Sequence, residues 1–365
     1  MSETMSQRSF PKGLLVVWIL VLLGLIFLVK QSRPITEVKT RRDKGFAGRT
    51  EKSLRQELSK IGIEEAWIRL ETPSTGIDQL KIRVPNDLPL LACNLEVTRI
   101  LRNGEGRVLR ATRDAQRNIV AIFAGTGNRA GIRILLLPDR RISRRTGRIA
   151  LIIDDFGGGN MEIAKKFCTL PQPITLAIFP GMETSQDIAD LALQHGHEVI
   201  VHLPMEPHDP DKDPGGDAIF VKQSTETIRT LTRRLLRSLP QAVGVNNHMG
   251  SKATEDPRVM RVVLDEVKRQ RKFFIDSRTS SSSVAYTLAR RMGIRTAKLE
   301  LFLDNEDDDD AVKKRLYELS DLATQDGKAI GIGHDRETTI EVLQEVLPQL
   351  ERRGFRFVKA SEIVE

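Results

Sequence analysis

Cysteine is scarce in this sequence: it contains only Cys93 and Cys168, which lie far apart and do not form a CxxC pair. This scarcity argues against a disulfide framework or a thiolate zinc site and favours two unpaired structural thiols. Aromatic residues make up only 5% of the chain, and no nucleic-acid-binding motif is recognisable, so we expect no nucleic acid partner. With 40% hydrophobic and 29% charged residues, the composition is ordinary for a globular protein.

Positive charge is concentrated in the N-terminal part of the chain. The first 148 residues contain 28 Lys and Arg against 14 Asp and Glu, whereas the remaining residues contain 29 against 35. The net charge of +8 therefore says little about the substrate of the C-terminal part. A basic segment beside a membrane favours contact with anionic lipid head groups or other envelope polyanions.

One uninterrupted hydrophobic run begins at Gly13 and ends at Val29. It is at the short end of a membrane span and long for a signal-peptide core, and no small-x-small cleavage site follows it. We therefore predict that residues 1–37 are an N-terminal tail and an uncleaved transmembrane signal anchor in an inner or plasma membrane. The rest of the chain is then expected on the periplasmic or extracytoplasmic side. Basic residues after the run outnumber those before it, which favours the opposite orientation.

Residues 38–138 predict a small α+β domain close to the membrane. Apolar residues have helical spacing in segments 53–61 and 88–101. Short apolar or alternating runs predict strands at 66–70, 79–84, 107–111, 119–123 and 132–137. None of the six histidines lies in this region, so we expect a packing or docking module rather than a catalytic one. The basic stretch 139–148 is the expected linker.

Residues 149–365 show a regular alternation of strand-like and helix-like segments, which predicts a parallel sheet, either open or closed into a barrel. The strand-like runs are 149–153, 174–179, 198–203, 242–246, 273–275, 294–297, 329–332 and 355–358. The amphipathic helical segments are 161–170, 184–195, 225–239, 256–270, 284–292, 310–325 and 338–352. A dinucleotide-binding fold is the alternative, and the absence of a GxGxxG turn disfavours it.

Acids, amides and imidazoles stand at the ends of five of these strands. In chain order they are Asp154, Asp155, His202, Asn246, Asn247, His248, Asp276, His334 and Asp335. In a parallel barrel the carboxyl ends of the strands converge on the face where catalytic residues lie. Two imidazoles and one carboxylate suit zinc or a similar divalent ion with an open position for water. Such an ion polarises a carbonyl and lowers the pKa of its bound water, as amide hydrolysis requires.

The order of these motifs resembles the divergent polysaccharide deacetylase family, which is related to the nodulation-type chitooligosaccharide deacetylases. The matching stretches are Ile-Asp-Asp (153–155), Gly-His-Glu-Val-Ile-Val-His-Leu-Pro-Met-Glu-Pro (196–207), Gly-Val-Asn-Asn-His-Met-Gly-Ser (244–251), Phe-Ile-Asp-Ser-Arg-Thr (274–279), Phe-Leu-Asp-Asn (302–305) and Gly-Ile-Gly-His (331–334). The resemblance implies a distorted (β/α)7–8 barrel over residues 149–365, dependence on a divalent metal, with zinc expected, and a carbohydrate or peptidoglycan-type substrate.

The resemblance also implies roles for individual residues. Asp154 would be the general base, Asp155 a metal ligand, His202 the second ligand and His334 the general acid. Ordinary deacetylases have a further histidine four residues after the one matched by His202, and this chain has Glu206 there.

The third ligand is therefore either Glu206 or His248, and we favour His248. We expect Asp276 to orient His334. Glu206, Asn246 and Asn247 are the candidates for substrate binding, although the two asparagines could equally satisfy backbone groups at the strand end.

Two functions follow from these expectations. The first is a membrane-anchored, metal-dependent hydrolase that removes acetyl groups from an envelope polysaccharide or a peptidoglycan fragment. The second is an envelope protein without catalysis that keeps the fold to bind a glycan or a protein. Glu206 in place of a histidine is the feature that keeps the second function open.

Overall fold

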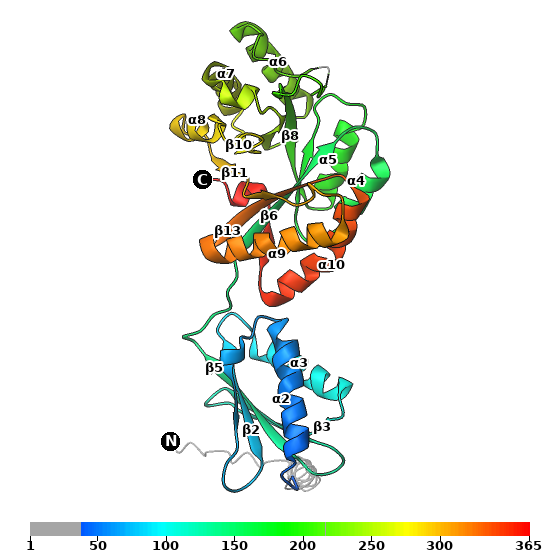
Figure 1. Ribbon diagram of the computed structural model, residues 1–365, viewed down its shortest axis with the longest axis vertical. Coiled ribbons are helices and arrows are strands. Elements are labelled where there is room, and N and C mark those ends of the chain that lie inside the picture. Colours follow the sequence, from blue (N-terminus) through cyan, green and yellow to red (C-terminus); the bar gives the residue numbers. More distant parts are fainter. Residues whose placement is uncertain (1–37, 216) are drawn as a thin grey trace, which may run out of the picture.

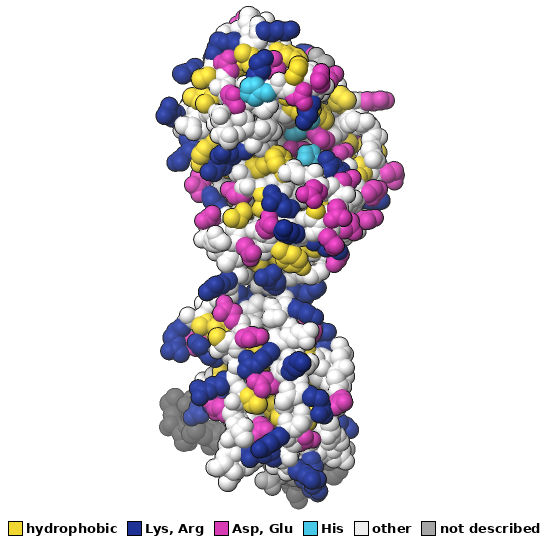
Figure 2. Space-filling view, in the orientation of Figure 1, with side chains coloured by type: hydrophobic (Ala, Val, Ile, Leu, Met, Phe, Trp, Pro, Cys, Tyr) yellow, Lys and Arg dark blue, Asp and Glu magenta, His cyan; other side chains and the backbone are white. Residues whose placement is uncertain are grey.

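The computed structural model describes residues 38–365 except residue 216. The described chain forms a smaller N-terminal part and a larger C-terminal part, joined by an extended segment (Figure 1). Lys and Arg side chains are spread over the smaller part (Figure 2). Each part has its own hydrophobic core, one built from residues between Phe46 and Leu136, the other from residues between Ile149 and Phe357.

The smaller part has a five-stranded sheet in the order β1-β2-β5-β4-β3. Its elements are α2 (Lys44–Ser59), the 3-10 turn Glu65–Trp67, β1 (Ile68–Glu71), β2 (Asp78–Pro85), α3 (Leu90–Asn103), β3 (Arg107–Asp114), β4 (Ile119–Gly125) and β5 (Ile132–Asp139). Alternate side chains of β2, such as Leu80 and Ile82, are fully buried and share a core with Leu54 of α2 and Val97 of α3. The predicted α+β character of this part is thus present in the structure.

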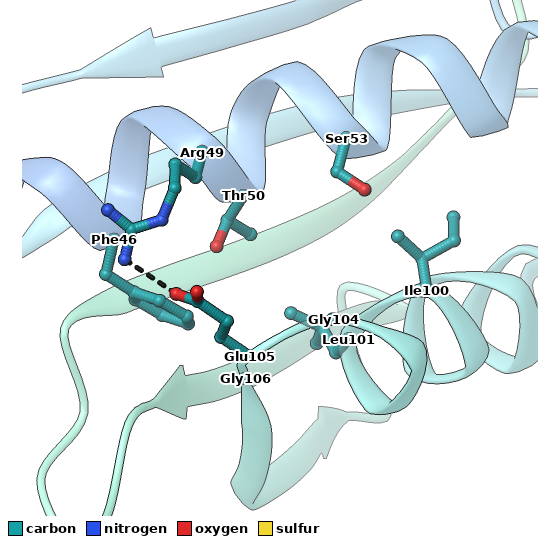
Figure 3. A pocket seen from close by; sticks show the side chains of 9 residues that line it. All are labelled: Phe46, Arg49, Thr50, Ser53, Ile100, Leu101, Gly104, Glu105 and Gly106. Carbon is teal, nitrogen blue, oxygen red and sulfur yellow. Dashed lines mark hydrogen bonds and ion pairs between the residues drawn. The ribbon is translucent and has the colours of Figure 1, made fainter.

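A hollow of about 240 Å³ lies between α2 and the end of α3 (Figure 3). Phe46 and Leu101 contribute apolar surface to it, and Arg49 pairs with Glu105 at 2.8 Å. Both charged side chains are mostly exposed, and no histidine lines the hollow. It therefore offers no obvious group for acid–base catalysis.

The larger part has a nine-stranded parallel sheet in the order β11-β10-β9-β8-β7-β6-β13-β12, with β14 paired to the start of β6. The strands are β6 (Arg148–Phe156), β7 (Thr175–Ile178), β8 (Glu198–Met205), β9 (Gly244–Met249), β10 (Phe273–Asp276), β11 (Thr296–Lys298), β12 (Leu301–Phe302), β13 (Lys328–His334) and β14 (Arg356–Val358). The helices are α4 (Met161–Cys168), α5 (Ser185–Gln194), α6 (Thr225–Ser238), α7 (Pro257–Arg269), α8 (Ala285–Arg291), α9 (Asp309–Asp326) and α10 (Glu337–Arg353).

The predicted β–α alternation is confirmed in the larger part, except that β12 follows β11 without a helix between them. Closure into a full barrel is not confirmed, because β11 and β12 stand at opposite ends of the strand order and do not pair in the described chain. β11 has three residues and β12 has two, too few to form the strand pairing that would close the sheet into a barrel. The sheet is an open half-barrel, with helices covering its outer face.

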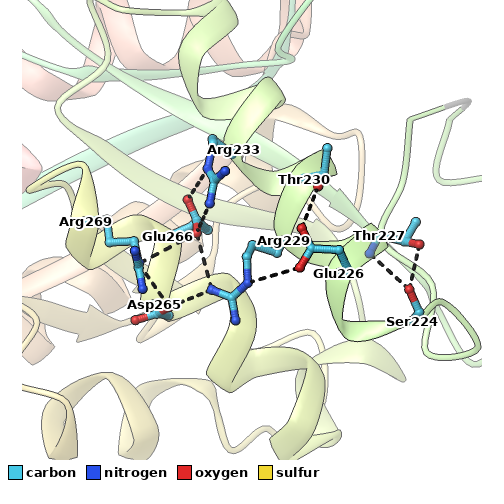
Figure 4. Close-up of polar contacts among 9 residues, drawn as sticks. All are labelled: Ser224, Glu226, Thr227, Arg229, Thr230, Arg233, Asp265, Glu266 and Arg269. Atoms are coloured by element: carbon cyan, nitrogen blue, oxygen red, sulfur yellow. Dashed lines mark hydrogen bonds and ion pairs between the residues drawn. The ribbon is translucent and has the colours of Figure 1, made fainter.

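An ionic network joins α6 to α7 on the outside of the half-barrel (Figure 4). Glu266 of α7 has a side chain only 2% exposed, and its two oxygens accept hydrogen bonds from Arg233 at 3.0 Å each. Arg229 reaches both Asp265 and Glu266 from the same helix, α6. The buried carboxylate of Glu266 is thereby paired with cations. Such pairing is needed because an unpaired charge is costly to bury between two helices.

The two parts meet around Arg144 in the connecting segment. Its guanidinium forms an ion pair with Asp87 at 2.8 Å and donates a hydrogen bond to the carbonyl of Arg352 at 3.0 Å. Gly62, with φ +79°, lies directly against the larger part, where a Cβ atom would come within 2.7 Å of the Arg353 carbonyl oxygen. Only glycine combines that backbone conformation with such a close approach.

No helix within residues 38–365, residue 216 aside, is both long and apolar enough to cross a membrane. The hydrophobic run predicted as a signal anchor, residues 13–29, lies outside the described residues.

Candidate metal centre and active site

Parallel register brings the polar strand ends of the larger part together. His334 on β13 stands opposite Asp154 on β6, and His202 on β8 stands opposite Asn246 on β9. These strands are neighbours or near neighbours in the sheet, so their carboxyl ends share one edge. The structure thus gathers residues that lie up to 180 positions apart in the sequence.

The alternation of side chains along each strand decides which residues face the inside of the half-barrel. On β6, Leu151 and Ile153 pack in the core beneath the helices, whereas Ala150 and Ile152 belong to a separate cluster on the inner face. Asp154 continues this inner row. The same alternation places three histidines and one asparagine on the inner face, namely His202, Asn246, His248 and His334.

Strict alternation would turn Asp155 towards the helices, but this residue departs from the pattern. Its φ is +74°, in the left-handed region that costs a residue with a Cβ atom about 1–2 kcal/mol. The pairing of β6 with β7 also shifts between Ile153 and Phe156. This local irregularity places the carboxylate of Asp155 within hydrogen-bonding distance of His202 and His248.

Asp155, His202 and His248 form a compact triangle of donor atoms. The Nε2 atom of His202 lies 3.1 Å from Oδ1 of Asp155 and 3.0 Å from Nδ1 of His248. The third side, between Nδ1 of His248 and Oδ1 of Asp155, measures 3.2 Å. Ligands bound tetrahedrally at about 2.0–2.1 Å from zinc are separated by about 3.3 Å. The donor set and its spacing therefore fit a divalent cation with one face open.

Asn246 fixes the ring orientation of His202. Its Nδ2 donates to Oδ1 of Asp154 at 2.8 Å, so its Oδ1 faces Nδ1 of His202, also at 2.8 Å. An amide oxygen only accepts, so Nδ1 of His202 carries the proton and Nε2 of the neutral ring presents a lone pair to the triangle. Asn246 is fully buried and occupied by these contacts, which favours the structural one of the two roles predicted for it.

The charges of the cluster favour a cation. Burial opposes a charge on His202, but Asp154 and Asp155 outweigh burial and raise the pKa of the imidazole to about 9. Burial likewise raises the pKa of Asp155, yet hydrogen bonds from His202 and His248 hold it well below its usual range. The ionised carboxylate thus attracts a positive charge, either as a proton on His202 or as a metal ion in its place.

Phe179 covers the two imidazoles of the triangle. Its ring, at the end of β7, lies edge-on to His202 and His248 with centroid separations of 5.0 and 4.8 Å. The aromatic ring therefore packs against both imidazoles and covers that side of the cluster.

His334 is held by Asp304, not by Asp276 as predicted. The Nδ1 atom of His334 lies 2.7 Å from Oδ1 of Asp304, whose Oδ2 accepts hydrogen bonds from the His334 amide and from Thr339. Asp304 is fully buried and lies two residues beyond the end of β12. The two-residue strand gives too weak a signal for its end to be recognised, although the apolar triplet 301–303 before an aspartate repeats the pattern of the other strand ends.

Strand alternation explains why Asp276 is not in the site. Phe273 and Ile275 of β10 belong to the inner cluster, so Asp276 points outwards with Phe274. Its carboxylate accepts hydrogen bonds from the Ser283 hydroxyl at 2.8 Å and from a backbone amide of α8 at 3.1 Å. The residue secures the start of α8 rather than the catalytic cluster.

Burial disfavours protonation of His334, but its hydrogen bond with Asp304 and the charges of three carboxylates raise the pKa above its ordinary value. The side chain remains 22% exposed. With Nδ1 bound to Asp304, Nε2 is the atom from which the ring can deliver a proton to a bound molecule.

Glu206 and Asn247, the other two candidates for substrate binding, both contact other parts of the protein. Glu206 pairs with Lys252 at 2.8 Å and accepts a hydrogen bond from the amide of Val221, so it ties two loops together. Asn247 is buried and binds the carbonyl of Met249 and the amide of Ser277. Glu206 is therefore not part of the donor triangle, which His248 completes.

Comparison with known proteins agrees with this geometry. A profile described as divergent polysaccharide deacetylase matches residues 151–364. The uncharacterized protein YibQ of Escherichia coli is 32% identical over 219 residues, which are 60% of this chain and 67% of YibQ. An uncharacterized protein of Haemophilus influenzae is 32% identical over 203 residues, covering 56% of this chain and 72% of the relative.

A solved structure shares the fold. The crystal structure of an uncharacterized protein from Agrobacterium tumefaciens superposes with a TM-score of 0.58 at 21% identity, covering 61% of this chain and 91% of that one.

Proposed function

The chain belongs to the divergent polysaccharide deacetylase family, and we propose on that premise that it is a metal-dependent hydrolase. Its substrate class would be an acetylated envelope polysaccharide or peptidoglycan fragment, from which it removes the acetyl group. The observation that carries this proposal is the triangle of Asp155, His202 and His248, flanked by Asp154 and by the Asp304–His334 pair.

Asp155, His202 and His248 would hold the divalent ion, for which zinc is our expectation. When bound, such an ion polarises the carbonyl of an acetyl group and makes a water molecule more acidic.

Asp154 is the proposed general base. Burial raises the pKa of its carboxyl group, so it accepts a proton more readily than an exposed aspartate would. Its Oδ1 is anchored by Asn246 at 2.8 Å, which holds the carboxylate in one position. We assign it the task of taking a proton from the attacking water.

His334 is the proposed general acid. Its raised pKa keeps a proton available on the ring, and Asp304 fixes the ring so that Nε2 faces away from the buried carboxylate. Donation from Nε2 to the leaving amine or alcohol completes the cleavage of the acetyl bond.

The proposed location follows from the substrate class and from the hydrophobic run. Residues 13–29 would anchor the chain in an inner or plasma membrane, with the half-barrel on the periplasmic or extracytoplasmic side, where envelope glycans are found.

Release of acetate from N-acetylated chitooligosaccharides and from peptidoglycan fragments tests the proposal, with protein loaded with zinc. We expect His334→Gln to lower kcat by about 10²–10⁴-fold. His195→Ala is the matched control, because His195 is exposed and its ring contacts the carbonyl of Leu191 at the end of α5, before β8 begins, and it should leave kcat unchanged. Glycan binding without acetate release by the unaltered, metal-loaded protein would instead favour a binding protein that keeps the fold.

A further inference from the structure

A strongly basic surface lies at the end of the smaller part that is remote from the half-barrel. Residues 38–148 contain 24 Lys and Arg against 12 Asp and Glu. Dark blue side chains are accordingly spread over the lower part in Figure 2. Four of these cations gather where the described chain enters the fold, and we name them the basic end surface: Lys39, Arg41, Lys44 and Arg129.

Backbone hydrogen bonds hold the basic end surface together. The amide of Arg41 donates to the carbonyl of Ala130, and the amide of Ala130 donates to the carbonyl of Lys39, both at 2.9 Å. This short parallel pairing places two segments, distant in sequence, side by side. Between them and the start of α2 is a polar hollow of roughly 700 Å³, whose lining includes Arg41, Lys44 and Arg129.

The four side chains are exposed, and in the part of the chain that the structure describes none of them forms an ion pair. Arg42 beside them differs, because its Nε lies 3.5 Å from Asp78. The one carboxylate in the lining, Asp43, uses Oδ1 to cap α2 through the amide of Phe46 at 2.9 Å. A group of basic side chains that are not paired with carboxylates of the same protein is typical of a surface that binds an anionic partner.

The position of the surface indicates which partner it meets. Helix α2 has 16 residues and is therefore about 24 Å long; it begins at Lys44 in the surface and ends near Gly62, which abuts the half-barrel. On the other side, residues 30–37 alone separate Val38 from the hydrophobic run, a chain length that reaches at most about 28 Å. The basic end surface thus faces the side of the molecule on which the proposed membrane anchor lies.

We propose that the basic end surface binds the anionic head groups of phospholipids. The smaller part then rests on the bilayer and holds the half-barrel away from it. This inference rests on the proposed membrane attachment but not on the proposed hydrolysis. Each basic residue near an anionic membrane strengthens binding roughly fivefold, so four of them are enough for measurable attachment.

Flotation of residues 38–365 with lipid vesicles tests the proposal without the hydrophobic run. This fragment contains both hydrophobic cores complete. We expect it to float with vesicles of phosphatidylcholine mixed with phosphatidylglycerol, to stay behind with pure phosphatidylcholine, and to be released by high salt. Changing Lys39, Arg41, Lys44 and Arg129 together to Gln should weaken binding by at least about tenfold.

The control variant removes the same charge from the half-barrel, at the exposed residues Arg237, Arg261, Arg291 and Arg356. It should float as the unaltered fragment does. Equal losses in both variants, or none in the first, would overturn the proposal, as would tighter binding to free glycerol phosphate or to DNA than to the anionic vesicles. Thermal unfolding of each variant confirms that the fold is kept. Acetate release is measured separately, so failure of the proposed hydrolysis leaves the vesicle result interpretable.

Discussion

At the scale of single residues, the proposed mechanism makes the contact between Asp304 and His334 set the pH range in which the leaving group can receive a proton. Burial favours the neutral ring, but Asp304 and its neighbouring carboxylates raise the pKa of His334. Activity that needs the protonated ring falls as the pH rises through this raised pKa. In Asp304→Asn the adjacent charge is lost, so the falling limb of the kcat–pH profile should move to lower pH.

Asp276→Asn is the matched control for this prediction. Asp276 is also a buried aspartate at a strand end, but its carboxylate secures the start of α8. The falling limb should keep its position in this variant. The opposite pattern, a shift in Asp276→Asn and none in Asp304→Asn, would restore the role that the sequence predicts for Asp276.

Two rules account for most of the candidate site from the sequence. Polar residues at strand ends identify Asp154, His202 and His334, and strand alternation separates His248, which faces inwards, from Asn247, which does not. Asp155 also stands at a strand end but breaks the alternation, because a left-handed backbone and a register shift bring it inside. Such local irregularities depend on the packed structure and leave no periodic trace in the sequence.

At the scale of secondary structure elements, the α6–α7 network makes a prediction about stability. Glu266→Ala removes a carboxylate bonded twice to Arg233, and we expect the free energy of unfolding to fall by about 2 kcal/mol. Glu226→Ala is the control, since Glu226 is 79% exposed and lies 3.8 Å from Arg229. It should change stability by less than about 0.5 kcal/mol. Urea unfolding of both variants measures the difference.

The contribution of Glu266 also depends on pH. Hydrogen bonds from Arg233 hold the pKa of Glu266 below its ordinary value of 4.5. A carboxyl group whose pKa is lowered in the folded state stabilises the fold at pH values above its ordinary pKa. This stabilisation is lost as the pH falls through the lowered, folded-state pKa. The difference between unaltered protein and Glu266→Ala should therefore shrink below about pH 4.5. A constant difference across that range would show that packing, not charge, causes the loss.

The elements themselves follow closely from periodicity. The seven predicted helices of the larger part all occur, because each has a broad apolar face that packs on the sheet. The sequence could not reveal β12, because its two residues span a single strand period and form no repeating pattern. The distorted barrel implied by the family resemblance is an open sheet in the structure, because its outermost strands are too short to pair.

At the scale of the whole molecule, Arg144 determines how firmly the two parts are held. Its side chain is 11% exposed and contacts both Asp87 and the carbonyl of Arg352. Arg144→Ala should speed proteolytic cleavage in residues 140–147 without changing the metal content of the half-barrel. The neighbouring Arg145, 81% exposed and 3.5 Å from Glu64, provides the control. Equal cleavage rates in the two variants would mean that other contacts hold the junction.

The metal content of residues 38–365, measured after reconstitution with zinc, tests the central claim most directly. We predict one equivalent in the unaltered fragment, a loss in His248→Ala, and full retention in Glu206→Ala, because His248 completes the donor triangle whereas Glu206 pairs with Lys252. Absence of bound metal from the unaltered fragment, or retention in His248→Ala with loss in Glu206→Ala, would contradict the account.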